Sequence, residues 1–105
     1  MAIARTVVAA TDISQEKMAV YKVSKNSKLS NLSGAIASAI QCGKVAEMQA
    51  IGAGAINQAI KAVSVARGMT APNGYYLVVV PSFCDVEIGG ETKTGMKLLV
   101  QSVPV

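Results

Sequence analysis

Four lysines in the N-terminal half of the chain follow one another with no acidic residue between them: Lys17, Lys22, Lys25 and Lys28. Lys25 and Lys28 enclose Asn26 and Ser27 in a polar loop. Ammonium groups and small polar donors on a loop suit contact with the phosphates of a nucleic-acid backbone. On charge alone, a solvated face that only keeps the protein in solution is an equal alternative.

Two further pairs of residues extend this candidate surface. Asn57 and Lys61 are four positions apart and share one face of a predicted helix. Lys93 and Lys97 lie on a predicted hairpin and could continue the contact as an arm laid into a groove. The chain has no Trp, one Phe and three Tyr, which argues against sequence-specific reading of single strands by stacking. Recognition of the nucleic-acid backbone is the mode that this composition favours.

Gly52 and Gly54 stand between a predicted strand and a predicted helix, where a dinucleotide-binding loop has its glycines. The third glycine of that motif would fall on Asn57, and Lys61 lacks the glycine spacing of a P-loop. We therefore interpret the glycines as a tight turn from strand into helix. The free N–H groups at the start of the helix could still receive a phosphate oxygen.

The remaining reactive residue types do not form a catalytic pattern. Asp85 and Glu87 are two apart on a predicted strand and so share a face, but no histidine accompanies them anywhere in the chain. We interpret them as a charged, solubilising edge. Cys42 and Cys84 lack metal-type spacing and are expected to be reduced, half-buried thiols. We expect no enzyme, no metal, no cofactor and no small-molecule substrate.

Composition sets the size class and the compartment. A chain of 105 residues that is 51% hydrophobic suffices for one domain, and its net charge is +4. No secretory segment and no apolar run of about 18 residues is present, so we expect a cytoplasmic protein that does not enter membranes. We divide it into an N-terminal extension over residues 1–18, with a short strand at residues 5–9, and a domain over residues 19–105.

The hydrophobic pattern along residues 19–105 predicts six elements in the order βαβαββ. Strands are expected at 19–23 and 45–51, followed by hairpin strands at 75–88 and 92–103 around Gly89-Gly90. Leu29, Leu32, Ile36 and Ile40 mark a first helix, capped by Ser30 or Asn31 and ended by Gly43. A second helix covers 55–69.

Two consecutive strand–helix units imply parallel strands, and Pro81 places its strand at a sheet edge or at a bulge. The predicted fold is α+β: a two-layer sandwich in which a four-stranded mixed sheet carries two helices on one face.

The second helix has more apolar surface than one covered face requires, because only Asn57, Lys61 and Ser64 form a narrow polar stripe. We expect a homodimer that buries the excess. The alternative is that the N-terminal extension covers this surface. The expected dimer interface consists of Ile56, Ala59, Ile60, Val63 and Arg67.

Three stretches carry a resemblance to a known family: VSKNSKLSNLSGAIASAI, AEMQAIGAGAINQAIKAVSVARG and APNGYYLVVVPSFCDVEIGGETKTGMKLLV. Over about residues 19–101 the chain resembles the stage V sporulation protein S family. The resemblance implies a fold similar to the archaeal chromatin protein Alba, usually dimeric, with a nucleic-acid-binding and regulatory role in sporulation or related development and no enzymatic activity. In Alba-like proteins the loop before the first helix and the hairpin arm touch nucleic acid, which points here to Lys25 and Lys28 and to Lys93 and Lys97.

Two functions remain as hypotheses. The first is a dimeric regulator that binds nucleic acid, DNA or RNA, mainly through phosphates. The second is a protein-interaction or scaffolding module in which the apolar helix face recruits partners and the lysines only keep the protein in solution.

Overall fold

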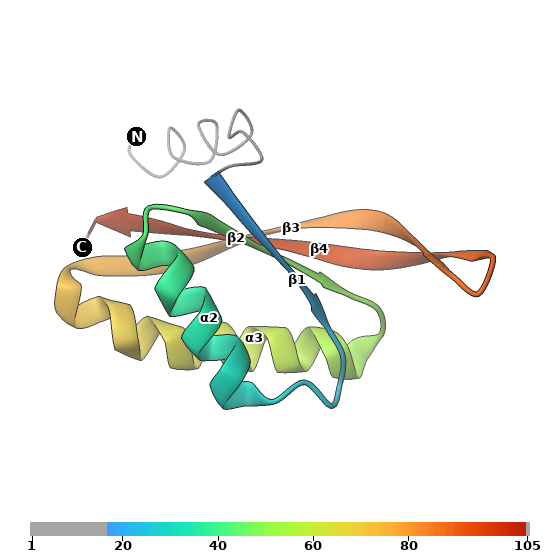
Figure 1. The fold of residues 1–105 in the computed structure, drawn as a ribbon, viewed down its shortest axis with the longest axis horizontal. Coiled ribbons are helices and arrows are strands. Elements are labelled where there is room, and N and C mark those ends of the chain that lie inside the picture. Colours follow the sequence, from blue (N-terminus) through green and yellow to red (C-terminus); the bar gives the residue numbers. More distant parts are fainter. Residues whose placement is uncertain (1–16, 105) are drawn as a thin grey trace.

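The computed structural model describes residues 17–104, and within this range the predicted order βαβαββ is confirmed (Figure 1). The elements are β1 (Met18–Val23), α2 (Leu29–Gln41), β2 (Val45–Ala50), α3 (Ala53–Thr70), the short 3-10 helix η2 (Ala71–Asn73), β3 (Tyr75–Ile88) and β4 (Glu91–Pro104). The short strand predicted at residues 5–9 lies outside the described residues. No helix in the described range is long and apolar enough to cross a membrane.

The four strands form one mixed sheet in the order β1-β2-β4-β3. β1 pairs with β2 in parallel, whereas β4 pairs with both β2 and β3 in antiparallel orientation. β3 is therefore an edge strand, as Pro81 predicted, because a residue without an N–H is tolerated where no further strand needs a donor. The predicted α+β class with a four-stranded mixed sheet is confirmed.

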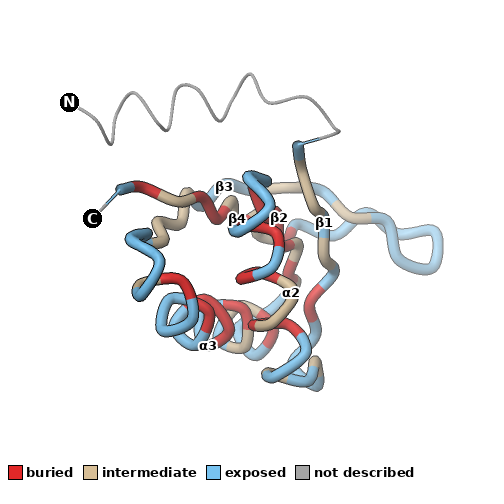
Figure 2. The backbone as a smooth tube through the Cα atoms, turned by 60° about the vertical axis from the view of Figure 1, so that its left-hand side comes forward, coloured by how far each residue is buried: buried red, intermediate tan, exposed pale blue. Residues whose placement is uncertain are grey.

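The core lies between the sheet and the two helices, which cover one face of it (Figures 1 and 2). Alternate residues of the central strands, such as Met48 and Val100, point into this layer and are fully buried. α2 contributes Ile36, and α3 contributes a row of small residues, Ala59, Ala62 and Ala66, each with no exposed surface. Small side chains let α3 lie close to both α2 and the sheet.

The start of α2 differs from the expectation. Neither Ser30 nor Asn31 caps the helix, because the Leu32 N–H already donates to the Lys28 carbonyl oxygen at 3.0 Å and the helix begins at Leu29. Lys28 is the N-cap, with an extended backbone and no side-chain cap. The predicted end at Gly43 is confirmed: Gly43 has φ 76°, and the Lys44 N–H donates to the Ala39 carbonyl oxygen at 2.9 Å, as in a Schellman motif.

The hairpin of β3 and β4 extends beyond the rest of the sheet (Figure 1). β2 pairs with β4 only as far as Met96, whereas β3 and β4 remain paired out to Ile88 and Glu91. We call this outer part, residues 84–95, the arm. Its tip is the predicted Gly89-Gly90 turn, with φ 60° and 80°, values that favour glycine at both positions.

Candidate nucleic-acid interface

The lysine loop between β1 and α2 is a turn held by its own serines. The Ser24 N–H donates to Ser27 Oγ at 2.9 Å, and the Ser27 N–H donates back to the Ser24 carbonyl oxygen at 3.1 Å. The Asn26 N–H donates to Ser24 Oγ at 3.1 Å. These bonds occupy the polar groups inside the turn and leave Lys25 and Lys28 exposed on its outside.

α3 fixes this turn from the side. Gln58 Nε2 donates to the Ser27 carbonyl oxygen at 2.7 Å, a contact across 31 residues of sequence. One turn earlier, a Cβ placed on Gly54 would lie 3.0 Å from Lys25 Cβ, so the absence of a side chain at Gly54 lets the loop rest against the helix. The sequence signal for this contact is the second glycine of the Gly52-x-Gly54 turn. The first, Gly52, has φ 89° and makes the expected sharp turn into the helix.

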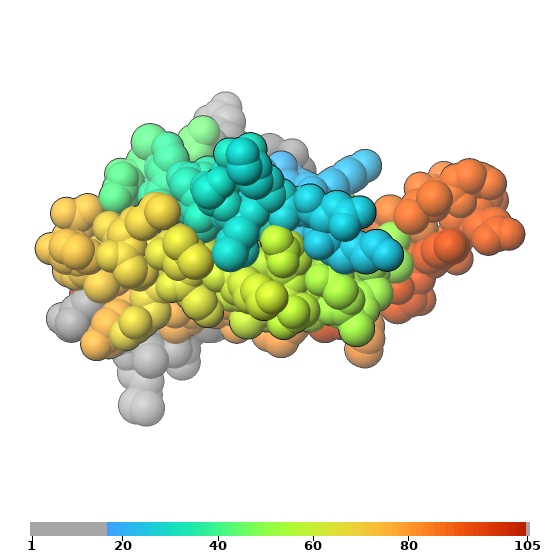
Figure 3. Space-filling view, turned by 90° about the horizontal axis from the view of Figure 1, so that it is seen from below, coloured from blue at the N-terminus to red at the C-terminus, as the bar shows by residue number. Residues whose placement is uncertain are grey.

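Lys25 thereby joins the polar stripe of α3. Gly54, Asn57 and Lys61 follow one another at spacings of three and four, so they form one ridge of the helix about 11 Å long. Asn57 and Lys61 are exposed, and neither the loop nor α2 nor α3 contains an acidic residue. In the space-filling view the loop lies directly over the first turns of α3, next to the arm (Figure 3). We call Lys25, Asn57 and Lys61 the basic ridge.

Lys28 lies on another side of the loop. It lines a shallow hollow between β1 and α2, together with Tyr21 and Asn31. Tyr21 spans this hollow, since its hydroxyl donates to the Ala35 carbonyl oxygen at 3.3 Å and burial raises the pKa of the phenol. Asn26 stays with the loop and is exposed.

The hairpin lysines are separate from the basic ridge. Lys97 is half-buried in a polar row that crosses all four strands, formed by register partners on the sheet face away from the helices: Lys22, Gln49, Lys97 and Ser82. Lys93 lies on the arm opposite Val86, and Asp85 and Glu87 stand opposite Thr94 and Thr92 on the other face of the arm. The position of Lys22 in this row follows from the register in which β1 pairs with β2.

The residues predicted for a dimer interface fall into two groups. Ala59 is fully buried and Val63 is 8% exposed, both inside the chain, because α2 and the sheet together cover a wider arc of α3 than a single covered face would. Ile60 remains 43% exposed and Ile56 is half-buried. Arg67 is exposed with its guanidinium over the Tyr76 ring, 5.0 Å from the ring centroid.

The remaining candidates show no catalytic grouping. Cys84 is half-buried as expected, whereas Cys42 is exposed because it is the C-cap of α2 at the helix end. Asp85 and Glu87 are exposed. Within residues 17–104, no three His, Cys, Asp or Glu side chains come together as a group able to hold a metal ion.

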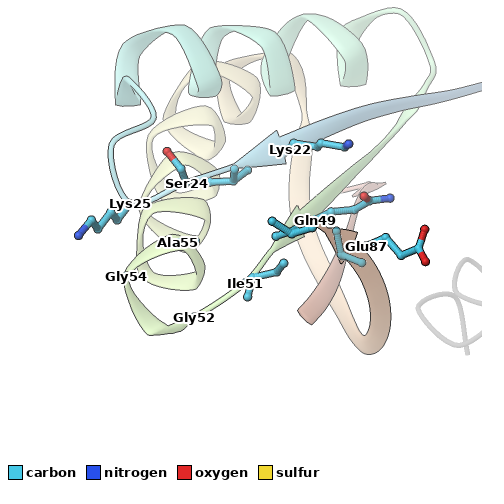
Figure 4. A pocket seen from close by; sticks show the side chains of 12 residues that line it. Lys22, Ser24, Lys25, Gln49, Ile51, Gly52, Gly54, Ala55 and Glu87 are labelled. Atoms are coloured by element: carbon cyan, nitrogen blue, oxygen red, sulfur yellow. The ribbon is translucent and has the colours of Figure 1, made fainter. Parts of the chain in front are cut away.

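A pocket that the sequence did not predict lies beside the basic ridge (Figure 4). Its volume is about 520 Å³, and it is bounded by the carboxyl ends of β1 and β2, the first turn of α3 and the arm. Lys25 stands at one end and Lys22, Gln49 and Glu87 at the other, with Ile51 between them (Figure 4). Three segments far apart in sequence build it, which is why no local pattern indicated it.

Comparison with known protein families agrees with the resemblance seen in the sequence. Residues 19–103 match the family described as Stage V sporulation protein S (SpoVS), a regulatory sporulation family and not a known enzyme family. The match runs from the second residue of β1 to the penultimate residue of β4 and so reaches every helix and strand of residues 17–104. The chain belongs to the SpoVS family.

Proposed function

We propose that this protein is a non-enzymatic, dimeric regulator that binds nucleic acid through its phosphates, with an Alba-like mode of contact. The observation that carries the proposal is the fixed position of Lys25. A hydrogen-bonded turn, the bond from Gln58 and the bare backbone of Gly54 hold the base of this lysine against the first turn of the helix that carries Asn57 and Lys61. Preformed positive groups without acidic neighbours attract phosphates at little ordering cost.

The basic ridge, rather than the arm, makes the main contact in this proposal. The arm carries three exposed carboxylates, Asp85, Glu87 and Glu91, against the single exposed Lys93. Such an arm is repelled by phosphates, whereas the ridge is not. Lys28 acts as a secondary contact at the edge of this surface, whereas Lys97, on the sheet face away from the helices, lies outside it.

Fluorescence anisotropy with labelled DNA and RNA at rising salt concentration tests the proposal. We expect Lys25→Glu and Lys61→Glu each to weaken binding at low salt and to reduce the slope of log affinity against log salt concentration by about one. Lys44→Glu is the matched control. It changes the charge equally at an exposed lysine, but beyond the far end of α2, a helix of 13 residues and about 20 Å.

The wild-type protein must bind at low salt for the proposal to stand. Equal losses in all three variants would mean that only net charge matters and that the ridge has no special part. Circular dichroism on each variant separates lost binding from lost folding.

One observation favours the protein-interaction alternative. Phe83, at the base of the arm, is 79% exposed, and Ile88 at its tip is 49% exposed. Aromatic side chains are enriched at protein–protein interfaces, so Phe83 is the residue that would contact a partner. Under this alternative, Phe83→Ser abolishes function in cells while Lys25→Glu leaves it unchanged.

A further inference from the structure

The pocket between the arm and the ends of β1 and β2 has the size of a ligand site. Pockets for small organic groups measure roughly 300–1,000 Å³, and this one is about 520 Å³. The arm supplies one wall with Val86 and Ile88, and the strand ends and α3 supply the others with Val23, Ile51 and Ala55. The lining is therefore mainly aliphatic, which suits the faces of a flat heterocycle.

A lysine stands at each end of this apolar chamber, and the Glu87 carboxylate lies at the Lys22 end (Figure 4). Lys22 and Lys25 both line it, and the figure shows them at opposite ends (Figure 4). A ligand with a single anionic group would need only one of these lysines as its partner. A nucleotide inside a strand has a phosphate on each side of its sugar, and two lysines with an apolar space between them match that arrangement.

Acceptors for a base edge also line the chamber. Gln49 Nε2 already donates to Glu47 Oε2 at 2.9 Å, so the Gln49 carbonyl oxygen is left to accept. The Glu87 carboxylate is a second acceptor at the same end of the pocket as Gln49 (Figure 4). Nucleobases carry amino and ring N–H donors on their edges, which are the complement of these two groups.

We infer that the pocket binds one unstacked nucleotide, with its base between Val86 and Ile51 and its flanking phosphates at Lys22 and Lys25. The inference rests on the proposed function, since Lys25 is shared with the basic ridge, and it adds a preference for single strands over duplexes. A paired base inside a duplex cannot enter the pocket, whereas a base in a single strand turns out readily. A free nucleotide has the same chemistry and is the other possible source.

The test uses the full chain and fluorescence anisotropy with three labelled probes: a single strand, the same strand with one central abasic position, and the duplex. We expect the abasic strand and the duplex to bind about five- to tenfold more weakly than the intact strand, since burial of one base is worth about that factor. A nucleoside monophosphate is added as a competitor, and its ability to displace the labelled strand shows whether the pocket binds a free nucleotide.

Val86→Glu places a carboxylate in the wall of the pocket at an arm position whose only ladder partner is Lys93. We expect it to abolish the difference between intact and abasic strands. Val65→Glu makes the same change at a 40%-exposed position of α3 outside the pocket and is expected to keep the difference. The readout is the ratio of the affinity for the intact strand to the affinity for the abasic strand. A general effect of added negative charge lowers both affinities and cancels in this ratio.

The outcomes separate the two proposals. Displacement of the strand by the monophosphate from the wild-type protein, but not from Val86→Glu, assigns the pocket to the free nucleotide. Salt-dependent binding that is equal for intact and abasic strands, with no competition by the monophosphate, overturns the pocket and leaves the proposed function standing. Absence of any binding at low salt overturns both.

Discussion

At the scale of single residues, two glycines decide how closely segments approach one another at the site. Gly54 lets the lysine loop rest on α3, as described above. Gly95 is buried where β4 passes the end of β2, and a Cβ added there would lie 2.9 Å from both the Ala50 carbonyl oxygen and Ile51 Cγ1. The Ala50 oxygen is backbone and has little freedom to move, so the clash cannot be relieved cheaply.

We therefore predict that Gly95→Ala destabilises the fold by about 1–3 kcal/mol and lowers Tm by about 5–15 °C. Because Ile51 also lines the pocket, the same change should weaken any ligand bound there. The matched control is Gly68→Ala on α3, where nothing lies within 4 Å of the added Cβ and alanine's higher helix propensity should raise stability by about 0.5–1 kcal/mol. Thermal unfolding followed by circular dichroism measures both, and equal Tm values for the two variants would contradict the prediction.

Gly95 also illustrates what local sequence can and cannot reveal. The hairpin, the edge position of β3 and the end of α2 follow from residues within a few positions of the feature, and all three were predicted. The need for glycine at position 95 depends on β2, 45 residues earlier, and no periodicity records it. The start of α2 was misplaced for a different reason: the helix begins directly after the serine turn with Lys28 as its N-cap, and no side-chain cap marks the position.

At the scale of elements, α3 supports most of the candidate site. Its first turn carries the loop, its exposed side carries Asn57 and Lys61, and its buried alanines hold it against α2 and the sheet. Among the side-chain hydrogen bonds of residues 17–104, one joins α3 to the loop: the bond from Gln58 to the Ser27 carbonyl oxygen. It positions Lys25 without adding charge.

We predict that Gln58→Leu lowers nucleic-acid affinity although the net charge is unchanged. Without the bond the loop becomes more mobile, and Lys25 must be ordered when the ligand binds, which costs about 1 kcal/mol or a factor of five. Stability should fall by a similar amount. Gln41→Leu, the same substitution at the exposed last residue of α2, is the control. Anisotropy and denaturant unfolding report the two quantities, and full affinity in Gln58→Leu would show that the loop needs no support.

At the scale of the whole molecule, the sequence predicted the architecture better than the surface. The six elements each left a periodic pattern, and their order restricted the topology to a parallel pair and a hairpin. The surface depends on how those elements meet. Lys25 and Lys97 look alike in sequence but lie on different sides of the molecule. The apolar surface of α3 is wide because both α2 and the sheet cover it, which the sequence of α3 alone does not show.

What remains apolar and exposed on α3 lies on two flanks of its polar stripe. Ile60, beside the half-buried Ile56, lies on one flank, and Val65 and Met69 lie on the other, all between 40% and 44% exposed. The Ile60 flank is the proposed dimer interface. Because the stripe lies next to it, a two-fold axis along this flank would bring two basic ridges to one side of the dimer.

We predict that Ile60→Asp converts the dimer into a monomer, since it places a charge at the centre of an apolar contact. Val65→Asp, the corresponding change on the opposite flank at similar exposure, should leave the dimer intact. Sedimentation velocity gives the mass of each species. The monomeric variant should also bind nucleic acid more weakly and with about half the salt slope, because only one basic ridge then contacts phosphates at a time. A wild-type protein that sediments as a monomer, or an Ile60→Asp variant that remains dimeric, would exclude this flank as the interface.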